Sequence, residues 1–256
     1  SGIRTTSGKY NSFVGYETGL YNTSGRNNVF LGYHAGYSND TASYNVFIGN
    51  EAGLLNNGSM NTFIGYSSGR NNTAGFYNCF FGDSTGYSNT TGYNNTFLGG
   101  RSGFSNTTGR GNVFIGSQAG YSNLNGNNNT FIGTYAGFKN SSGANNVMIG
   151  LYAGSNNTTG QSNIFIGDKT GYFNTNGNTN VMIGNQAGFE NTSGYMNVFL
   201  GTGAGQANAT GANNTMIGTA AGNSNITGIE NVMVGRSSGS KNKTGNNNVF
   251  IGSQAG

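Results

Sequence analysis

The chain has 256 residues, of which 48 are glycine, none is proline or tryptophan, and only 7% are charged. Its net charge of +4 comes from singly scattered side chains, eleven basic and seven acidic, so it lacks the concentrated basic surface of a nucleic-acid-binding protein. No stretch approaches the ~20 apolar residues of a membrane span, and no signal peptide is visible.

Short apolar triplets, each closed by a glycine, recur along the whole chain. Turn-forming residues bound them, and their β-branched and aromatic composition favours strands over helices. The predicted strands, in chain order, are residues 12–14, 29–31, 46–48, 62–64, 79–81, 96–98, 113–115, 130–132, 147–149, 164–166, 181–183, 198–200, 215–217, 232–234 and 249–251. The closing glycines lie 17 residues apart, except for Gly49 and Gly65, which are 16 apart. This period predicts an all-β fold, a parallel β-solenoid (β-roll) of fifteen coils in one continuous array over residues 1–256.

Three glycines recur in each repeat, such as Gly116, Gly120 and Gly126. They predict corners where φ is positive or where stacked backbones approach closely. Ala42 is the one exception at the third corner. The 16-residue repeat loses its residue in the corner at 56–58, which indicates a surface turn.

Two asparagines also recur, one before each triplet, such as Asn28, and one at the start of each Asn-Thr-Thr-Gly corner, such as Asn89. In-register stacking places like residues about 4.8 Å apart. At that spacing the side-chain amides can form hydrogen-bonded ladders, and each can also cap its own corner.

Alternation along a strand sends Val113 and Ile115 to one face and Phe114 to the other, so both faces are apolar. A column of Phe and Met left in water would be a larger apolar patch than a soluble monomer shows. We therefore expect one stripe to fill the coil interior and the other to pack against neighbouring chains. The alternative is a flattened solenoid that buries both stripes within one chain.

The motif Asn-x-Phe-Ile-Gly-x-x-Ala-Gly, as in residues 112–120 and 129–137, resembles the repeat of the left-handed parallel β-roll heads of trimeric autotransporter adhesins. Related repeats occur in phage tail fibres and in Bacteroidetes-like surface proteins. The adhesin repeat is shorter, and it carries a small Ala where this chain has Phe or Met. The resemblance covers all fifteen coils. It implies a homotrimeric rod displayed outside the cell or on a virion.

No residue set predicts catalysis, a cofactor site or a strong metal site. His34, the only histidine, takes a variable position and is expected at the solvated surface; Glu17 and Glu51 share its column and would bind a metal at most weakly. Cys79 begins a triplet and is expected to be a buried small residue. The seven acids lie mostly in different coils: Glu17, Asp40, Glu51, Asp83, Asp168, Glu190 and Glu230.

Ten of the fifteen tyrosines lie before residue 94. Exposed tyrosines can stack on sugars, but they also form plain ladders between neighbouring strands, which is the interpretation we favour. Ten corners match the acceptor pattern Asn-x-Ser/Thr, among them Asn22 and Asn157. That pattern is compatible with glycan attachment, but composition alone also produces it.

The sequence thus predicts a non-enzymatic structural segment, the shaft of an extracellular fibre, surface filament or adhesin. Its expected partners are copies of itself, as a trimer and end to end, and a surface glycan or host receptor. We also expect a fragment of a longer fibre, because neither end shows a polar cap. The alternatives are a phage tail-fibre receptor-binding shaft, an ice- or glycan-binding solenoid with columns of corner threonines such as Thr90 and Thr107, and a polysaccharide lyase.

Overall fold

The computed structural model describes residues 1–256 as strands and turns. It contains no helix, and therefore none long and apolar enough to cross a membrane. The chain divides into two compact units, Ser1–Asn128 and Asn129–Gly256.

Every repeat contributes one strand of three residues, at the position that the sequence predicts. The strands of the first unit are β1 (Ser12–Val14), β2 (Val29–Leu31), β3 (Val46–Ile48), β4 (Thr62–Ile64), β5 (Cys79–Phe81), β6 (Thr96–Leu98) and β7 (Val113–Ile115). Those of the second unit are β8 (Thr130–Ile132), β9 (Val147–Ile149), β10 (Ile164–Ile166), β11 (Val181–Ile183), β12 (Val198–Leu200), β13 (Thr215–Ile217), β14 (Val232–Val234) and β15 (Val249–Ile251).

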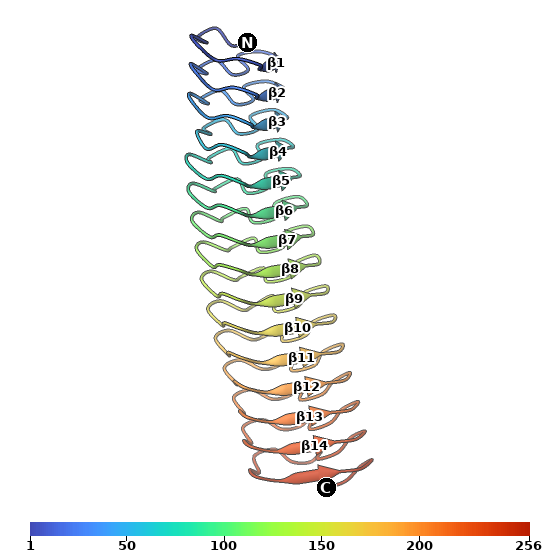
Figure 1. The fold of residues 1–256 in the computed structure, drawn as a ribbon. Helices are drawn as coiled ribbons and strands as arrows, with labels where there is room; N and C mark the ends of the chain where they lie inside the picture. The colour runs from blue at the N-terminus through green and yellow to red at the C-terminus, as the bar shows by residue number, and fades with distance from the viewer. The chain divides into compact units, whose positions relative to one another are not determined.

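Within each unit the strands stack in parallel and in sequence order (Figure 1). The register pairs like with like, so that Phe30 lies opposite Phe47 and Phe165 opposite Met182. The 16-residue repeat keeps this register, since Phe47 pairs with Phe63. The predicted parallel β-solenoid is confirmed.

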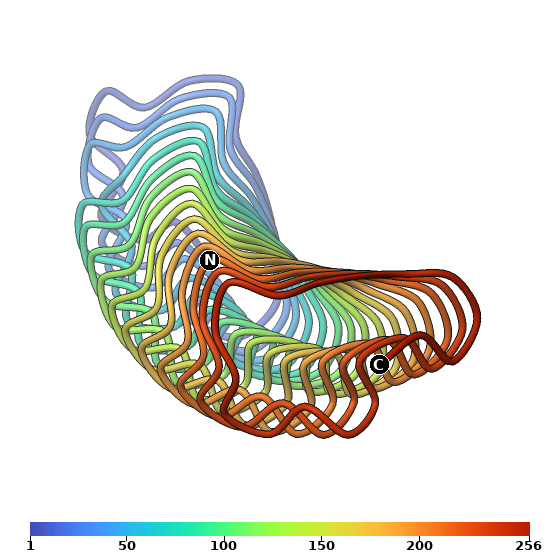
Figure 2. The ribbon, with the colours of Figure 1, turned by 90° about the horizontal axis from the view of Figure 1, so that it is seen from below.

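Each coil has two layers, seen along the stack as the two long sides of a flattened loop (Figure 2). The first layer is the strand. The second layer is the segment that begins four residues after the end of the strand, residues 18–23 in the first full coil. It has its own hydrogen bonds between coils, for example from Gly36 N–H to Ala52 O at 2.9 Å and from Ser38 N–H to Leu54 O at 2.9 Å. The turning of successive coils within each unit is the usual twist of a β-sheet.

The middle residue of each strand fills the space between the layers. In the first unit these residues are phenylalanines stacked nearly parallel, with Phe30 and Phe47 ring centroids 4.8 Å apart and Phe97 and Phe114 4.7 Å apart. In the second unit Met148 and Met182 take the same fully buried place. The middle strand position is therefore interior in both units, whether Phe or Met occupies it.

The corner glycines have the two properties that the sequence predicts, which are a positive φ at some corners and a close approach of stacked backbones at others. In one coil, Gly99 has φ of +123° and Gly103 has φ of +57°. Gly109 has an ordinary φ, but a Cβ there would lie 2.6 Å from Gly126 O in the next coil. The third corner is thus a place of close backbone approach, which excludes larger residues.

Ala42, the exception at that corner, lies one coil before the shortened corner at 56–58. At the equivalent Gly25, a Cβ would point at the corner of the following coil, 2.4 Å from Ala42 O. The Cβ of Ala42 therefore points at the one corner that has lost a residue. We infer that the missing residue gives this methyl group its room.

Candidate functional site

The first and third residues of each strand form an apolar outer face on the first layer. Every strand from β2 to β14 has a fully buried middle residue between two half-buried or exposed neighbours. Phe97, for instance, is 0% exposed, whereas Leu98 is 43% exposed. One stripe therefore fills the interior and the other faces outward, as the alternation predicts. The alternative that buries both stripes in one chain is wrong.

In the second unit this outer face is almost wholly aliphatic. Its first column contains Val, Thr and Ile, and its third column contains Ile, Leu and Val. Since like residues pair in register, the side chains form two continuous columns along the unit. A continuous apolar sheet face of this kind is characteristic of an interaction surface.

Cys79 lies on the same outer face of the first unit and is exposed, so the prediction that it is buried is wrong. The reason is its place in the strand. As the first residue of β5 it points away from Phe80, which occupies the interior.

His34, Glu17 and Glu51 do not converge on a metal site. The His34 Nε2 lies 2.9 Å from Glu17 Oε2, and its ring stacks on Tyr33 with centroids 3.8 Å apart. Glu51 instead accepts a hydrogen bond from Arg70 Nε at 2.7 Å, which raises the pKa of the Arg70 guanidinium. The structure has no group of three or more His, Cys, Asp or Glu side chains arranged around a common point.

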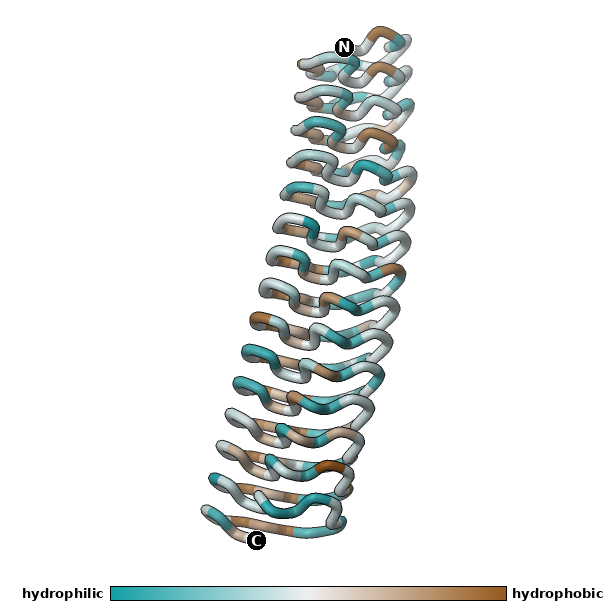
Figure 3. The backbone as a smooth tube through the Cα atoms, turned by 180° about the vertical axis from the view of Figure 1, so that it is seen from behind, coloured by the Kyte–Doolittle hydropathy of each residue, from teal (hydrophilic) through white to brown (hydrophobic).

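Aromatic side chains line up between coils on the second layer and near the corners of the first unit. Tyr87 stacks on Phe104 with ring centroids 5.1 Å apart, and Phe76 stacks on Tyr93 at 4.9 Å. Such stacked pairs bear out the interpretation of the tyrosines as ladders. Elsewhere the residues of the second layer are mostly neutral or hydrophilic, with scattered hydrophobic ones (Figure 3).

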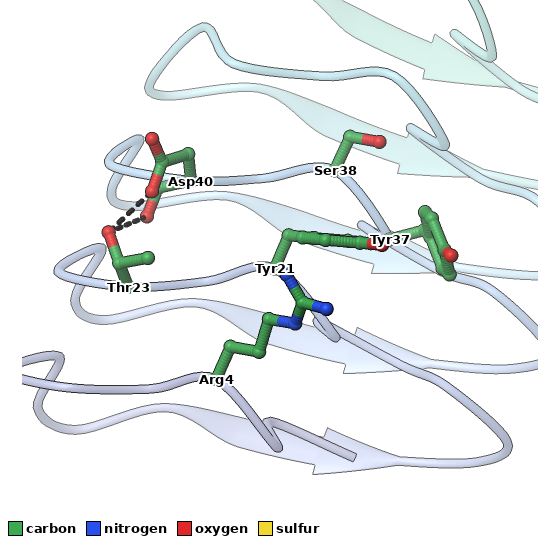
Figure 4. Close-up of a pocket in the computed structure, with 6 residues that line it drawn as sticks. All are labelled: Arg4, Tyr21, Thr23, Tyr37, Ser38 and Asp40. Carbon is green, nitrogen blue, oxygen red and sulfur yellow. Dashed lines mark hydrogen bonds between the residues drawn. The ribbon is translucent and has the colours of Figure 1, made fainter.

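A pocket of about 550 Å³ interrupts this pattern over the second layer of the first coils (Figure 4). It is lined by Arg4, Tyr21, Thr23, Tyr37, Ser38 and Asp40. These residues are separated by about one repeat along the chain, and stacking of the coils brings them together.

The Tyr21 ring lies at the centre of the pocket, between the level of Arg4 and the level of Ser38 (Figure 4). The Arg4 guanidinium carbon is 4.4 Å from the ring centroid, and the Tyr37 ring meets Tyr21 edge to face at 5.0 Å. The nearby Tyr21 side chain raises the pKa of Tyr37. The Thr23 hydroxyl donates to the Asp40 carboxylate, which fixes that acid at the other end of the pocket.

Nine of the ten corner asparagines that match the acceptor pattern for glycosylation are fully buried, and the tenth, Asn242, is half-buried. Asn22, Asn89, Asn106 and Asn157 are 0% exposed. The Asn89 amide nitrogen, which would carry the glycan, donates to Gly92 O at 3.0 Å and to Asn72 Oδ1 at 2.6 Å. The folded chain therefore offers no glycan attachment at the nine buried corners.

The corner threonines form hydrogen bonds between successive coils. The Thr90 hydroxyl donates to Thr107 O at 3.0 Å, and the Thr107 hydroxyl donates to Leu124 O at 2.8 Å. Each hydroxyl hydrogen is thus donated to a carbonyl oxygen of the next coil and is not free for a ligand. These threonine columns are therefore poorly suited to binding ice or a glycan.

Comparisons with protein-family models, with curated proteins and with solved structures find no match to this chain. The candidate surfaces are therefore defined by the structure alone. Strand alternation predicts two separate apolar stripes, and the structure shows which of them is the outer face. The Tyr21 pocket depends on residues at variable positions, and no motif in the sequence marks it.

Proposed function

We propose that this chain is a non-enzymatic length of fibre shaft, in which three copies pack side by side through the outer faces of their first layers. The observation that carries the proposal is the apolar outer face. The interior is already filled by Phe and Met, so the exposed Val, Ile and Leu columns are not needed for the coil's own core.

The stacked architecture supports a mechanical role. Each coil is bonded to the next by the strand ladder, by the backbone bonds of the second layer and by the asparagine columns. Load along the stack is thus shared by many hydrogen bonds per coil. The repeat's resemblance to adhesin heads favours three copies and a place outside the cell or on a virion, with receptors bound by segments of the fibre or by the shaft itself.

The oligomeric state of the whole chain in solution tests the proposal. Analytical ultracentrifugation should find about 80 kDa, three times the chain mass of 26.5 kDa. Ile183→Lys places a charge on the outer face and should yield a monomer with an unchanged circular dichroism spectrum, because Ile183 is not in the interior.

Ile226→Lys is the matched control. Ile226 is 41% exposed and Ile183 is 38% exposed, but Ile226 lies at a corner instead of on the outer face. The control should remain a trimer. A monomeric unmodified chain, or a trimer that survives Ile183→Lys, would overturn the proposal.

Cys79 supplies a second readout, because it is the only thiol and lies on the outer face of the first unit. In the trimer a maleimide reagent should label it at least about tenfold more slowly than in the urea-unfolded chain. Equal labelling rates would show that the outer face of β5 is uncovered.

A further inference from the structure

We propose that the pocket around Tyr21 binds one hexopyranose unit of a neutral glycan. The site lies on the second layer, whereas the proposed trimer contact lies on the first layer. The proposal therefore does not rest on the fibre function, and the pocket stays open whether the chain is monomeric or trimeric.

The face of the Tyr21 ring is the recognition element. Aromatic rings bind the apolar C–H face of a pyranose by stacking, as they bind other flat apolar surfaces. Arg4 covers one face of the Tyr21 ring at 4.4 Å. The residue that follows Tyr21 in the same column is Ser38, whose side chain is too small to cover the other face (Figure 4).

Stacked aromatic pairs elsewhere in the first unit leave no room for a sugar between their rings. A sugar ring inserted between two aromatic rings needs about 7 Å between them, two van der Waals contacts. Tyr87 and Phe104 are only 5.1 Å apart, and Tyr16 and Tyr33 are 5.6 Å apart. The change from Tyr21 to Ser38 within one column is what opens the pocket.

The polar groups that line the pocket suit hydroxyls, and Asp40 lies at the end away from the Tyr21 ring (Figure 4). Asp40 can accept hydrogen bonds from sugar hydroxyls while Thr23 holds it in place, and the Ser38 and Tyr37 hydroxyls lie at the same pocket. The charges of Arg4 and Asp40 are opposite, so the lining carries no net charge. This balance favours a neutral sugar over an acidic or a basic one.

Saturation-transfer NMR and calorimetric titration with methyl β-D-glucopyranoside, methyl β-D-galactopyranoside and N-acetyl-D-glucosamine test the site on the whole chain. At least one of the three should bind with a Kd on the order of 1 mM, as expected for a single sugar unit. Tyr21→Ala should weaken that binding at least about tenfold, because it removes the stacking surface.

Ser38→Tyr tests the same site while it keeps the Tyr21 ring, because the new side chain fills the space next to that ring. The new ring should stack on Tyr21 as the rings of other columns do, and binding should be lost while the fold is retained. The control is Ser88→Tyr, at the same position of a later coil and equally half-buried, which should bind the sugar like the unmodified chain. No binding of any of the three sugars up to about 50 mM, or unchanged binding by Ser38→Tyr, would overturn the proposal.

Discussion

At the scale of single residues, the asparagines do most to hold neighbouring coils together. Asn78 donates its main-chain N–H to Asn61 Oδ1 at 2.9 Å and its side-chain amide to Gly92 O at 2.8 Å. Its own Oδ1 accepts from Asn95 N–H at 3.0 Å. Both predicted roles are confirmed, since the strand asparagines form ladders and the corner asparagines also cap their own turns.

This bonding makes Asn78→Ala strongly destabilising. The variant leaves Gly92 O and Asn95 N–H buried without these partners, so we expect a loss of about 3 kcal/mol in the free energy of unfolding by urea. Asn50→Ala is the matched control, because the Asn50 side chain is exposed; its loss should stay within about 0.5 kcal/mol. Equal losses of unfolding free energy for the two variants would contradict the stabilising role that we assign to the asparagine ladder.

At the scale of the strand, three residues suffice because the middle one contributes to a continuous interior column. Phe97 is fully buried and stacks on Phe80 at 4.8 Å and on Phe114 at 4.7 Å. A strand this short would not be stable alone, but in-register neighbours on both sides extend its packing.

Substitutions of Phe97 should separate the contribution of side-chain volume to stability from the contribution of aromatic stacking. Phe97→Ala should cost about 3–5 kcal/mol of unfolding free energy, because it opens a cavity in a closed column. Phe97→Met should cost less than about 1.5 kcal/mol, since the second unit already places Met148 and Met182 at the equivalent position. Urea denaturation of both variants measures the difference, and similar losses would indicate that the ring stacking itself is essential.

At the scale of the whole molecule, the repeat makes each coil interchangeable with its neighbours. Ile164 pairs with Val181 and Asn180 bonds to Asn163, so equivalent positions of adjacent coils present the same groups to each other. Stability in such a stack is a sum over coils and the contacts between neighbours.

One whole repeat should therefore be removable. Deletion of residues 164–180 joins Asn163 to Val181 and restores every column, so the variant should fold with a native-like circular dichroism spectrum and a cooperative urea transition. Deletion of residues 164–171, about half a repeat, is the control and should disrupt folding, because it puts Tyr172 where a strand residue belongs. If the two deletions fold equally well, register is not what specifies the coil.

Much of this molecule could be predicted from the sequence alone. The spacing of Gly99 and Gly116 sets the coil length, the triplets mark the strands, and the recurring asparagines indicate the ladders. These features are local or strictly periodic, so each coil of the stack repeats what a single repeat of the sequence already indicates. The alternation along Val113–Ile115 likewise places the outer residues and Phe114 on opposite faces.

Only the tertiary structure decided which face is the interior. Alternation separates the two stripes, but the direction in which the chain turns after the strand determines which of them the second layer covers. That turn buries Phe80 and exposes Cys79, which the sequence had suggested was buried. The Tyr21 pocket has the same origin, because Arg4, Tyr21 and Ser38 are distant in sequence and meet only when the coils stack.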